Sequence, residues 1–204
     1  MNVVLLAAIL ALQGCGGSAN NVADLSCSDA AAGTYPAQST SPYVLPYSIG
    51  ETYIVGQGNC TNFSHNASFN QQFAYDFVMP IGTTLVASRS GVVVAVEEGF
   101  SDGTGVPGEE NFIVVEHDDG TTSRYIHLTT LGAVVDLQDT VVQGRVIAMS
   151  GHSGNSTAPH LHFDVGDGPC TPHVNTNCRS LPVNFRNTSP HVNGLVEGQS
   201  YTAE

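Results

Sequence analysis

The hydrophobic positions of this chain occur in short runs separated by turn residues. From about Tyr43 onward these runs have the length and composition of β-strands. We predict strands at 84–87, 91–97, 111–116, 124–128, 145–150 and 160–165. The sequence Asp118-Asp119-Gly120 lies between two of these runs and predicts a hairpin. No window of helical length has convincing helical periodicity with capping residues, so the pattern predicts a mostly β, antiparallel fold.

The N-terminal residues have the pattern of an export signal. The apolar run from Val3 to Leu12 is shorter than the roughly 20 residues that span a bilayer, and it fits the apolar region of a secretory signal. The following Gly14-Cys15 resembles the lipobox of bacterial lipoproteins, in which the cysteine becomes the lipidated first residue. No lysine or arginine precedes the apolar run, so an ordinary cleaved signal that discards Cys15 remains an alternative.

The remaining chain divides by composition. We predict a signal peptide over 1–14, a tether or poorly ordered leader over 15–42, one domain over 43–190 and a loop-like tail over 191–204. With 204 residues, 41% of them hydrophobic, the chain is long enough for one sizeable core.

The charge balance excludes some partners. The chain has 18 acidic and 5 basic residues, a formal net charge of -13 and no lysine. Nucleic-acid binders neutralise phosphates with clustered lysine and arginine, so we expect no nucleic-acid partner. Electrostatic docking on anionic lipid is disfavoured for the same reason. We therefore expect membrane contact only through a lipid at Cys15.

The cysteines agree with export. Lipidation of Cys15 would leave four cysteines: Cys27, Cys60, Cys170 and Cys178. An even set in an exported chain predicts disulfides, with three possible connectivities. The proximity of Cys170 and Cys178 favours a local pair, which would leave Cys27 to pair with Cys60. A zinc site made of these four cysteines is the rival, and the lack of a C-x-x-C spacing argues against it.

The most informative motif is GNSTAPHLHFDV at 154–165. Side chains alternate faces along a strand, so His160 and His162 share one face while Leu161 and Phe163 point into a core. Two imidazoles on one face can hold a metal, or one can bind it while the other touches substrate. A polar sheet face would give the same pattern.

Further residues favour the metal. His127 ends a predicted strand, and Ser64-His65 lies upstream. Asp76 lies between apolar residues on another predicted strand, where a buried carboxylate must be paired or metal-bound. The chain thus offers three ligands for Zn²⁺, an open fourth position, and two spare imidazoles.

These motifs resemble the lysostaphin-like, LytM-type zinc metallopeptidases. The resemblance runs from about Tyr43 to Asn187 and rests on DFVMPIGT at 76–83, GVV at 91–93 and the 154–165 motif. It implies antiparallel sheets that form a barrel-sandwich groove like the duplicated hybrid motif, with little helix. It implies one Zn²⁺ bound by His65, Asp76 and His162. It also implies a catalytic pair, His127 and His160.

The first ligand departs from the common family pattern, H-x-G-x-D. Gln72 occupies the position of that histidine, and amides are poor zinc ligands. A variant subset with Ser-His and a longer insertion before the aspartate looks closer to this sequence. His65, eleven residues before Asp76, fits that variant.

The implied activity is that of a metalloendopeptidase acting on peptidoglycan stem or cross-bridge peptides. Zinc in such a site lowers the pKa of a water toward about 7 and polarises the scissile carbonyl. His127 and His160 would share proton transfer and stabilisation of the oxyanion. Two alternatives remain open: a non-catalytic LytM-type module that positions or activates another wall hydrolase, and an extracellular protease acting on glycine-rich proteins.

Several polar residues are expected to have no catalytic role. The remaining histidines lie in turns or loops and are expected at the surface: His117, His152, His173 and His191. Asp164 and Asp167 lie near glycines, and they lack the ligand count of a calcium loop. We expect them in a turn.

Overall fold

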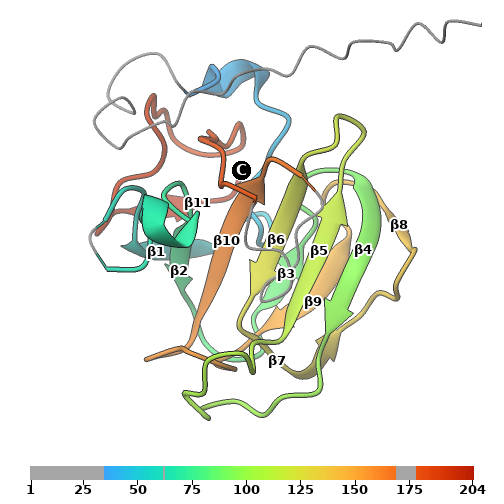
Figure 1. Ribbon diagram of the computed structural model, residues 1–204. Helices are drawn as coiled ribbons and strands as arrows, with labels where there is room; N and C mark the ends of the chain where they lie inside the picture. The colour runs from blue at the N-terminus through green and yellow to red at the C-terminus, as the bar shows by residue number, and fades with distance from the viewer. Residues whose placement is uncertain (1–34, 62, 169–177) are drawn as a thin grey trace, which may run out of the picture.

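The strands of the computed structural model form two antiparallel sheets (Figure 1). The structure describes residues 35–61, 63–168 and 178–204. The larger sheet has the strand order β11-β1-β2-β10-β6-β5-β4-β8, and the smaller has the order β3-β9-β7. The strands are β1 (Thr52–Gln57), β2 (Tyr75–Val78), β3 (Thr84–Val86), β4 (Gly91–Glu97), β5 (Phe112–Glu116), β6 (Thr122–Ile126), β7 (Leu128–Ala133), β8 (Thr140–Val141), β9 (Val146–Ser150), β10 (His160–Gly166) and β11 (Ser200–Thr202).

Helical structure is confined to two short 3-10 turns among the described residues. These are η2 (Gln38–Thr40) and η3 (Ala67–Phe69). Within the same residues, no helix has the length and apolar character needed to cross a membrane.

The prediction of a mostly β, antiparallel fold is confirmed. The six strands predicted by range are all present, as β3, β4, β5, β6, β9 and β10, and the strand predicted around Asp76 is β2. The predicted hairpin joins β5 to β6, and Gly120 in its turn has a φ of 80°. A positive φ of this kind favours glycine, because a side chain would be strained there.

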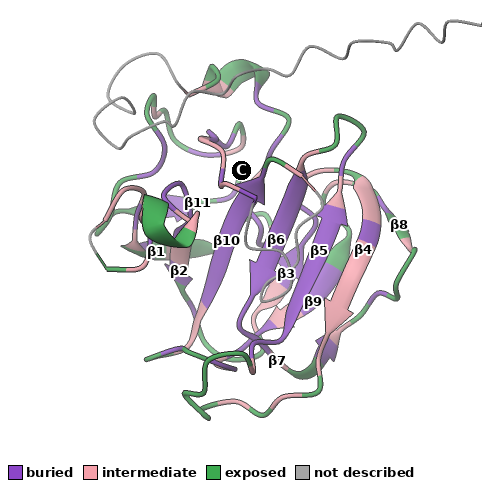
Figure 2. Cartoon of the chain, viewed as in Figure 1, coloured by how far each residue is buried: buried purple, intermediate pink, exposed green. Residues whose placement is uncertain are grey.

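The core lies between the two sheets. One cluster of buried residues combines Leu85 and Ile147 of the small sheet with Val93, Tyr125 and other side chains of the large sheet. Figure 2 shows that the central strands β10, β6 and β5 are almost entirely buried. Burial of apolar surface provides the main driving force for folding. Here the buried cluster holds in place the central strands beside the candidate catalytic side chains.

The ends of the described chain pack more closely than their composition predicts. The tail predicted over 191–204 is corrected at its end, because β11 pairs antiparallel with the edge of the sheet at β1. Tyr201 is buried there and its hydroxyl accepts the N–H of Val196. In the predicted leader, the Gln38 amide donates to the carbonyl oxygens of Phe185 and Thr188 at 3.0 Å. The predicted domain boundaries at 43 and 190 stay predictions.

His117 is buried, which corrects its expected surface position. Its Nδ1 donates to the Ser90 carbonyl oxygen at 2.9 Å, and its Nε2 lies 2.8 Å from the Ser123 hydroxyl. Burial lowers the pKa of His117, and the positive charge of Arg89 acts in the same direction, while the Ser90 carbonyl opposes them. The folded state therefore favours the neutral imidazole.

Replacing His117 with glutamine is expected to change how stability depends on pH. The pKa of His117 is lower in the folded than in the unfolded chain, so the unfolded chain binds more protons below about pH 6.5. The wild type should lose stability as the pH falls below that value, by at most about 1.4 kcal/mol per pH unit from this group. Urea unfolding of both proteins between pH 7 and 5 measures the difference. An unfolding free energy that falls with pH equally in the wild type and in His117→Gln would contradict this prediction.

Candidate active site

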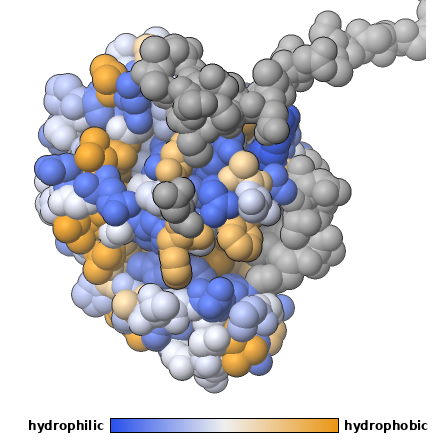
Figure 3. All heavy atoms as spheres, turned by 60° about the vertical axis from the view of Figure 1, so that its left-hand side comes forward, coloured by the Kyte–Doolittle hydropathy of each residue, from blue (hydrophilic) through white to orange (hydrophobic). Residues whose placement is uncertain are grey.

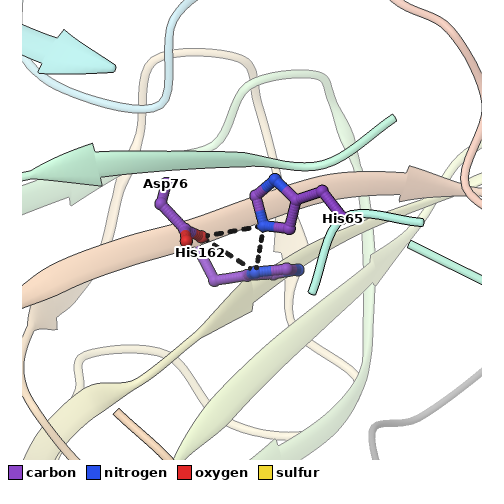
Figure 4. Close-up of side chains that lie close together, drawn as sticks. All are labelled: His65, Asp76 and His162. Atoms are coloured by element: carbon purple, nitrogen blue, oxygen red, sulfur yellow. Dashed lines mark hydrogen bonds and ion pairs between the residues drawn. The ribbon is translucent and has the colours of Figure 1, made fainter. Parts of the chain in front are cut away.

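Three side chains meet at the centre of the large sheet. The distances are 3.0 Å between His162 Nδ1 and Asp76 Oδ1, 3.2 Å between His65 Nε2 and Asp76 Oδ1, and 3.3 Å between His65 Nε2 and His162 Nδ1. Figure 4 shows the two imidazoles and the carboxylate pointing toward one another. The family resemblance of the sequence motifs implies this same set as metal ligands.

The sheet register explains two of these positions. His162 on β10 is the cross-strand partner of Asp76 on β2, and opposed residues of an antiparallel pair share a face. His65 comes from the long connection between β1 and β2, and it is fully buried. Its Nδ1 donates to the Gly58 carbonyl oxygen at 2.9 Å. A carbonyl can only accept, so the Nε2 lone pair of His65 faces Asp76.

The three atoms have a spacing that suits zinc. Ligand bonds of about 2.0–2.1 Å in tetrahedral geometry place two ligand atoms about 3.3 Å apart, close to the distances between His65 Nε2, Asp76 Oδ1 and His162 Nδ1. Two imidazoles and one carboxylate are also a donor set that zinc accepts. The residues present therefore fit one Zn²⁺ with room for a further ligand.

The charges around His162 favour a cation. Burial lowers the pKa of His162, but the carboxylates of Asp164 and Asp76 outweigh burial and raise it to about 9. Burial raises the pKa of Asp76, yet contacts with His162 and His65 hold it well below its usual range. The cluster thus stabilises positive charge beside an ionised carboxylate, as a divalent cation requires.

His127 and His160 lie next to this cluster. Their ring centroids are 4.6 Å apart, and His160 Nε2 is 3.7 Å from Asp76 Oδ1. His127 follows β6 with a φ of 64°, which turns the chain sharply at the end of the strand. Burial lowers the pKa of His127 to about 3, and it also lowers that of His160. Both imidazoles are therefore neutral near pH 7.

Backbone carbonyls fix the tautomers of these two imidazoles. His127 Nδ1 donates to the Ser153 carbonyl oxygen, and His160 Nδ1 donates to the Ala158 carbonyl oxygen, both at 2.8 Å. With the hydrogen on Nδ1, each ring keeps its lone pair on Nε2. Each Nε2 can therefore accept a proton, which is the property that a general base needs.

Asp164 and Arg124 form a buried pair behind the site that sequence analysis missed. Arg124 Nε and Nη2 donate to the two Asp164 oxygens at 2.5 and 2.6 Å. Asp164 is fully buried on β10, not in the turn expected for it. Its Oδ2 lies 3.6 Å from His162 Nε2, an atom with no hydrogen bond. The strand alternation that places His160 and His162 on one face also places Asp164 there, and this signal could have identified it.

Replacing Asp164 with asparagine is expected to weaken zinc binding by about 10–100-fold, the usual effect of changing a carboxylate behind a metal-binding histidine. The substitution removes the negative charge that faces His162 Nε2. Competition with a zinc chelator measures the affinity.

Asp167→Asn is the matched control, because Asp167 also pairs with an arginine, Arg179, but does so outside the cluster. Equal zinc affinities for the wild type and Asp164→Asn would contradict the prediction. Melting of the zinc-free proteins would separate a change in affinity from a loss of folding.

The cluster opens into a groove of about 450 Å³. The groove lining includes Asp76, His127, His160 and His162, together with the 155–159 segment. Phe63, which is 76% exposed, lines it on the side of the His65 connection. Figure 3 turns the β1 and β2 side of the molecule forward and shows separate hydrophobic patches among hydrophilic residues. A larger hollow of about 620 Å³ lies elsewhere, near β4 and β8, and contains none of the clustered site residues.

Comparison with known families identifies the family of the chain. A family model described as Peptidase family M23 matches residues 70–173, just over half of the chain. The chain belongs to peptidase family M23. The resemblance to lysostaphin-like enzymes that the sequence motifs indicate is thereby confirmed. The M23 match begins after His65, so this candidate ligand comes from a segment outside the matched range.

The M23 chain is similar to curated bacterial enzymes over part of its length. It is 36% identical to peptidoglycan DD-endopeptidase ShyA of Vibrio cholerae over 90 residues. That aligned region covers 44% of this chain and 19% of ShyA. It is 38% identical to lysostaphin of Staphylococcus simulans over 91 residues, and that aligned region covers 45% of this chain and 17% of lysostaphin. The matches thus span about a fifth of the length of these relatives. A solved structure of S. simulans lysostaphin aligns with a TM-score of 0.47 at 29% identity, covering 69% of this chain and 51% of that chain.

Proposed function

We propose that this M23 chain is a zinc-dependent metalloendopeptidase that cleaves peptide bonds of the peptidoglycan stem or cross-bridge. The observation that carries the proposal is the triangle of His65 Nε2, Asp76 Oδ1 and His162 Nδ1. Two neutral imidazoles lie beside this triangle. The names of two relatives, a peptidoglycan DD-endopeptidase and a glycyl-glycine endopeptidase, support the wall peptide as substrate.

The residues of the chain divide the chemistry between binding and proton transfer. Bound Zn²⁺ supplies a Lewis acid that polarises the scissile carbonyl and makes water more acidic. Asp76, ionised in the folded chain, and the imidazoles of His65 and His162 would hold it.

His127 and His160 would move the proton. Each presents a lone pair at Nε2, so either can take a proton from the attacking water and deliver it to the leaving amine. An imidazole that has accepted this proton also becomes a donor, which allows it to stabilise charge on the substrate oxygen. We assign these two roles to the pair jointly.

Wall digestion with metal control tests the proposal. We expect zinc-loaded protein to release peptide amines from purified wall sacculi, chelated protein to release none, and added zinc to restore release. Glycine-rich protein substrate is run in parallel, and cleavage of that substrate alone would replace the wall with an extracellular protein target. Stoichiometric zinc without any cleavage would favour the non-catalytic module that positions or activates another hydrolase.

Export belongs to the same proposal. The predicted signal, Cys15, Cys27, Cys170 and His173 lie outside the described residues. Cys60 and Cys178 each take part in a disulfide, which supports an oxidising compartment. We place the mature protein at the periplasmic face of a membrane as a lipoprotein, or outside the cell as a secreted enzyme. The pairing of Cys27 with Cys60, and of Cys170 with Cys178, remains a prediction.

A further inference from the structure

One loop orients both of the paired imidazoles. The 151–159 loop provides the Ser153 carbonyl oxygen that accepts from His127 Nδ1 and the Ala158 carbonyl oxygen that accepts from His160 Nδ1. A shift of this loop would therefore change the orientation of both rings at once. What holds the loop in place decides whether both Nε2 atoms face the metal cluster.

The carboxylate of Glu110 holds the middle of this loop. Its Oε1 accepts the N–H of Asn155 at 2.9 Å, and its Oε2 accepts the N–H of Gly108 at 3.0 Å. Glu110 is only 6% exposed, yet it lines the same groove as His127 and His160. The side chain thus joins the acidic 99–111 connection to the loop that orients the imidazoles.

The backbone of the loop is shaped to receive Glu110. Gly154 has a φ of 67°, and a Cβ added there would lie 2.3 Å from Glu110 Cγ and 2.7 Å from Glu110 N. No side chain fits at that distance, so glycine is needed for the close approach as well as for the positive φ.

A second carboxylate anchors the beginning of the loop. Asp102 Oδ1 accepts the N–H of His152 at 2.6 Å, and its Oδ2 accepts the Thr129 hydroxyl at 2.5 Å. The Ser153 hydroxyl adds to this anchor, because it donates to the Leu128 carbonyl oxygen at 2.7 Å and accepts the N–H of Asn111 at 2.9 Å. The contact between Glu110 and Asn155 then holds the part of the loop that runs on from Gly154 to Ala158.

We infer that Glu110 is a positioning residue that holds the 151–159 loop so that His127 and His160 both present Nε2 to the metal cluster. This inference rests on the proposed function for its kinetic consequence and on the geometry alone for its structural one. Because Glu110 acts through the loop, its loss should lower kcat while zinc and substrate still bind.

Two variants of Glu110 separate the effect of side-chain length from the effect of negative charge. Glu110→Asp keeps the charge but is one methylene too short to reach Asn155, and a displacement of about 1 Å can cost about 10²-fold in rate. We expect its kcat to fall by about that factor with zinc content unchanged and KM within a few-fold. Glu110→Gln keeps a side-chain oxygen that can accept the Asn155 N–H. It loses the acceptor for the Gly108 N–H, but Gly108 is exposed and its N–H can bond to water instead. We expect it to retain most of the wild-type kcat.

Glu109→Gln is the matched control, because it removes one negative charge, as Glu110→Gln does, from the neighbouring residue. Long-range ¹H–¹⁵N spectra of the zinc-loaded proteins report the tautomers of His127 and His160 without any turnover. We expect single Nδ1–H tautomers in the wild type, Glu110→Gln and Glu109→Gln, and altered or mixed ones in Glu110→Asp.

Unchanged tautomers and kcat in Glu110→Asp would overturn the inference, as would equal losses in Glu110→Gln and Glu110→Asp. If the wild type cleaves no peptide, the proposed function fails, and the tautomer comparison still decides the role of Glu110.

Discussion

Replacing His65 with alanine is expected to remove zinc from the protein and to abolish wall digestion. The substitution deletes one of three protein ligands and leaves Asp76 and His162 to hold the ion alone. Changes outside the ligand shell already cost about 10–100-fold in affinity, so a lost ligand should cost more than about 100-fold. Zinc quantification after purification, with a chelator titration, measures this effect.

Gln72→Ala is the matched control for that result. Gln72 occupies the position where the common family pattern has its first histidine, and it is buried. If His65 is the ligand instead, Gln72→Ala keeps its zinc. A His65→Ala protein that stays fully loaded and active, or a Gln72→Ala protein that folds but loses its zinc, would contradict the assignment.

Replacing His127 with alanine is expected to leave zinc in place and to stop turnover. His127 lies beside the cluster without belonging to the three-atom triangle, and its neutral imidazole offers Nε2 to a substrate or water. Loss of a general acid or base costs about 10²–10⁴-fold in rate. The measurement is kcat on wall peptides beside zinc content.

The control for His127 is His191→Ala, which removes an imidazole that lies outside the groove. It should keep both zinc and activity. A His127→Ala protein with wild-type kcat would show that His160 alone carries the proton. A His127→Ala protein that folds but loses zinc would show that His127 is a ligand.

Local sequence patterns were sufficient to predict the centre of the fold. The six predicted strands with clear apolar runs are all present in the structure, because burial on a pleated strand imposes that pattern. The alternation of His160, Leu161, His162 and Phe163 predicts two faces, and in the structure the histidines lie beside Asp76 while Leu161 and Phe163 lie in the core. Asp76 stands out in the sequence because a carboxylate between apolar residues needs a partner.

The missed features depend on contacts between distant segments. β8 has two residues and β11 has three, too few to show an alternating pattern, and pairing with neighbouring strands defines them. His117 lies next to a turn in the sequence, but a hydrogen bond to the Ser90 carbonyl oxygen and one with the Ser123 hydroxyl accommodate it in the interior. The Arg124–Asp164 pair joins β6 to β10 through their register. Neither residue alone indicates that pairing.

Anomalous diffraction at the zinc absorption edge, on crystals of the purified protein, tests the central claim most directly. We expect one strong peak per chain, within bonding distance of His65 Nε2, Asp76 Oδ1 and His162 Nδ1. Loss of that peak in crystals of His65→Ala would agree with it. A peak located elsewhere in the chain, or zinc-loaded crystals with no peak between these three atoms, would contradict the claim.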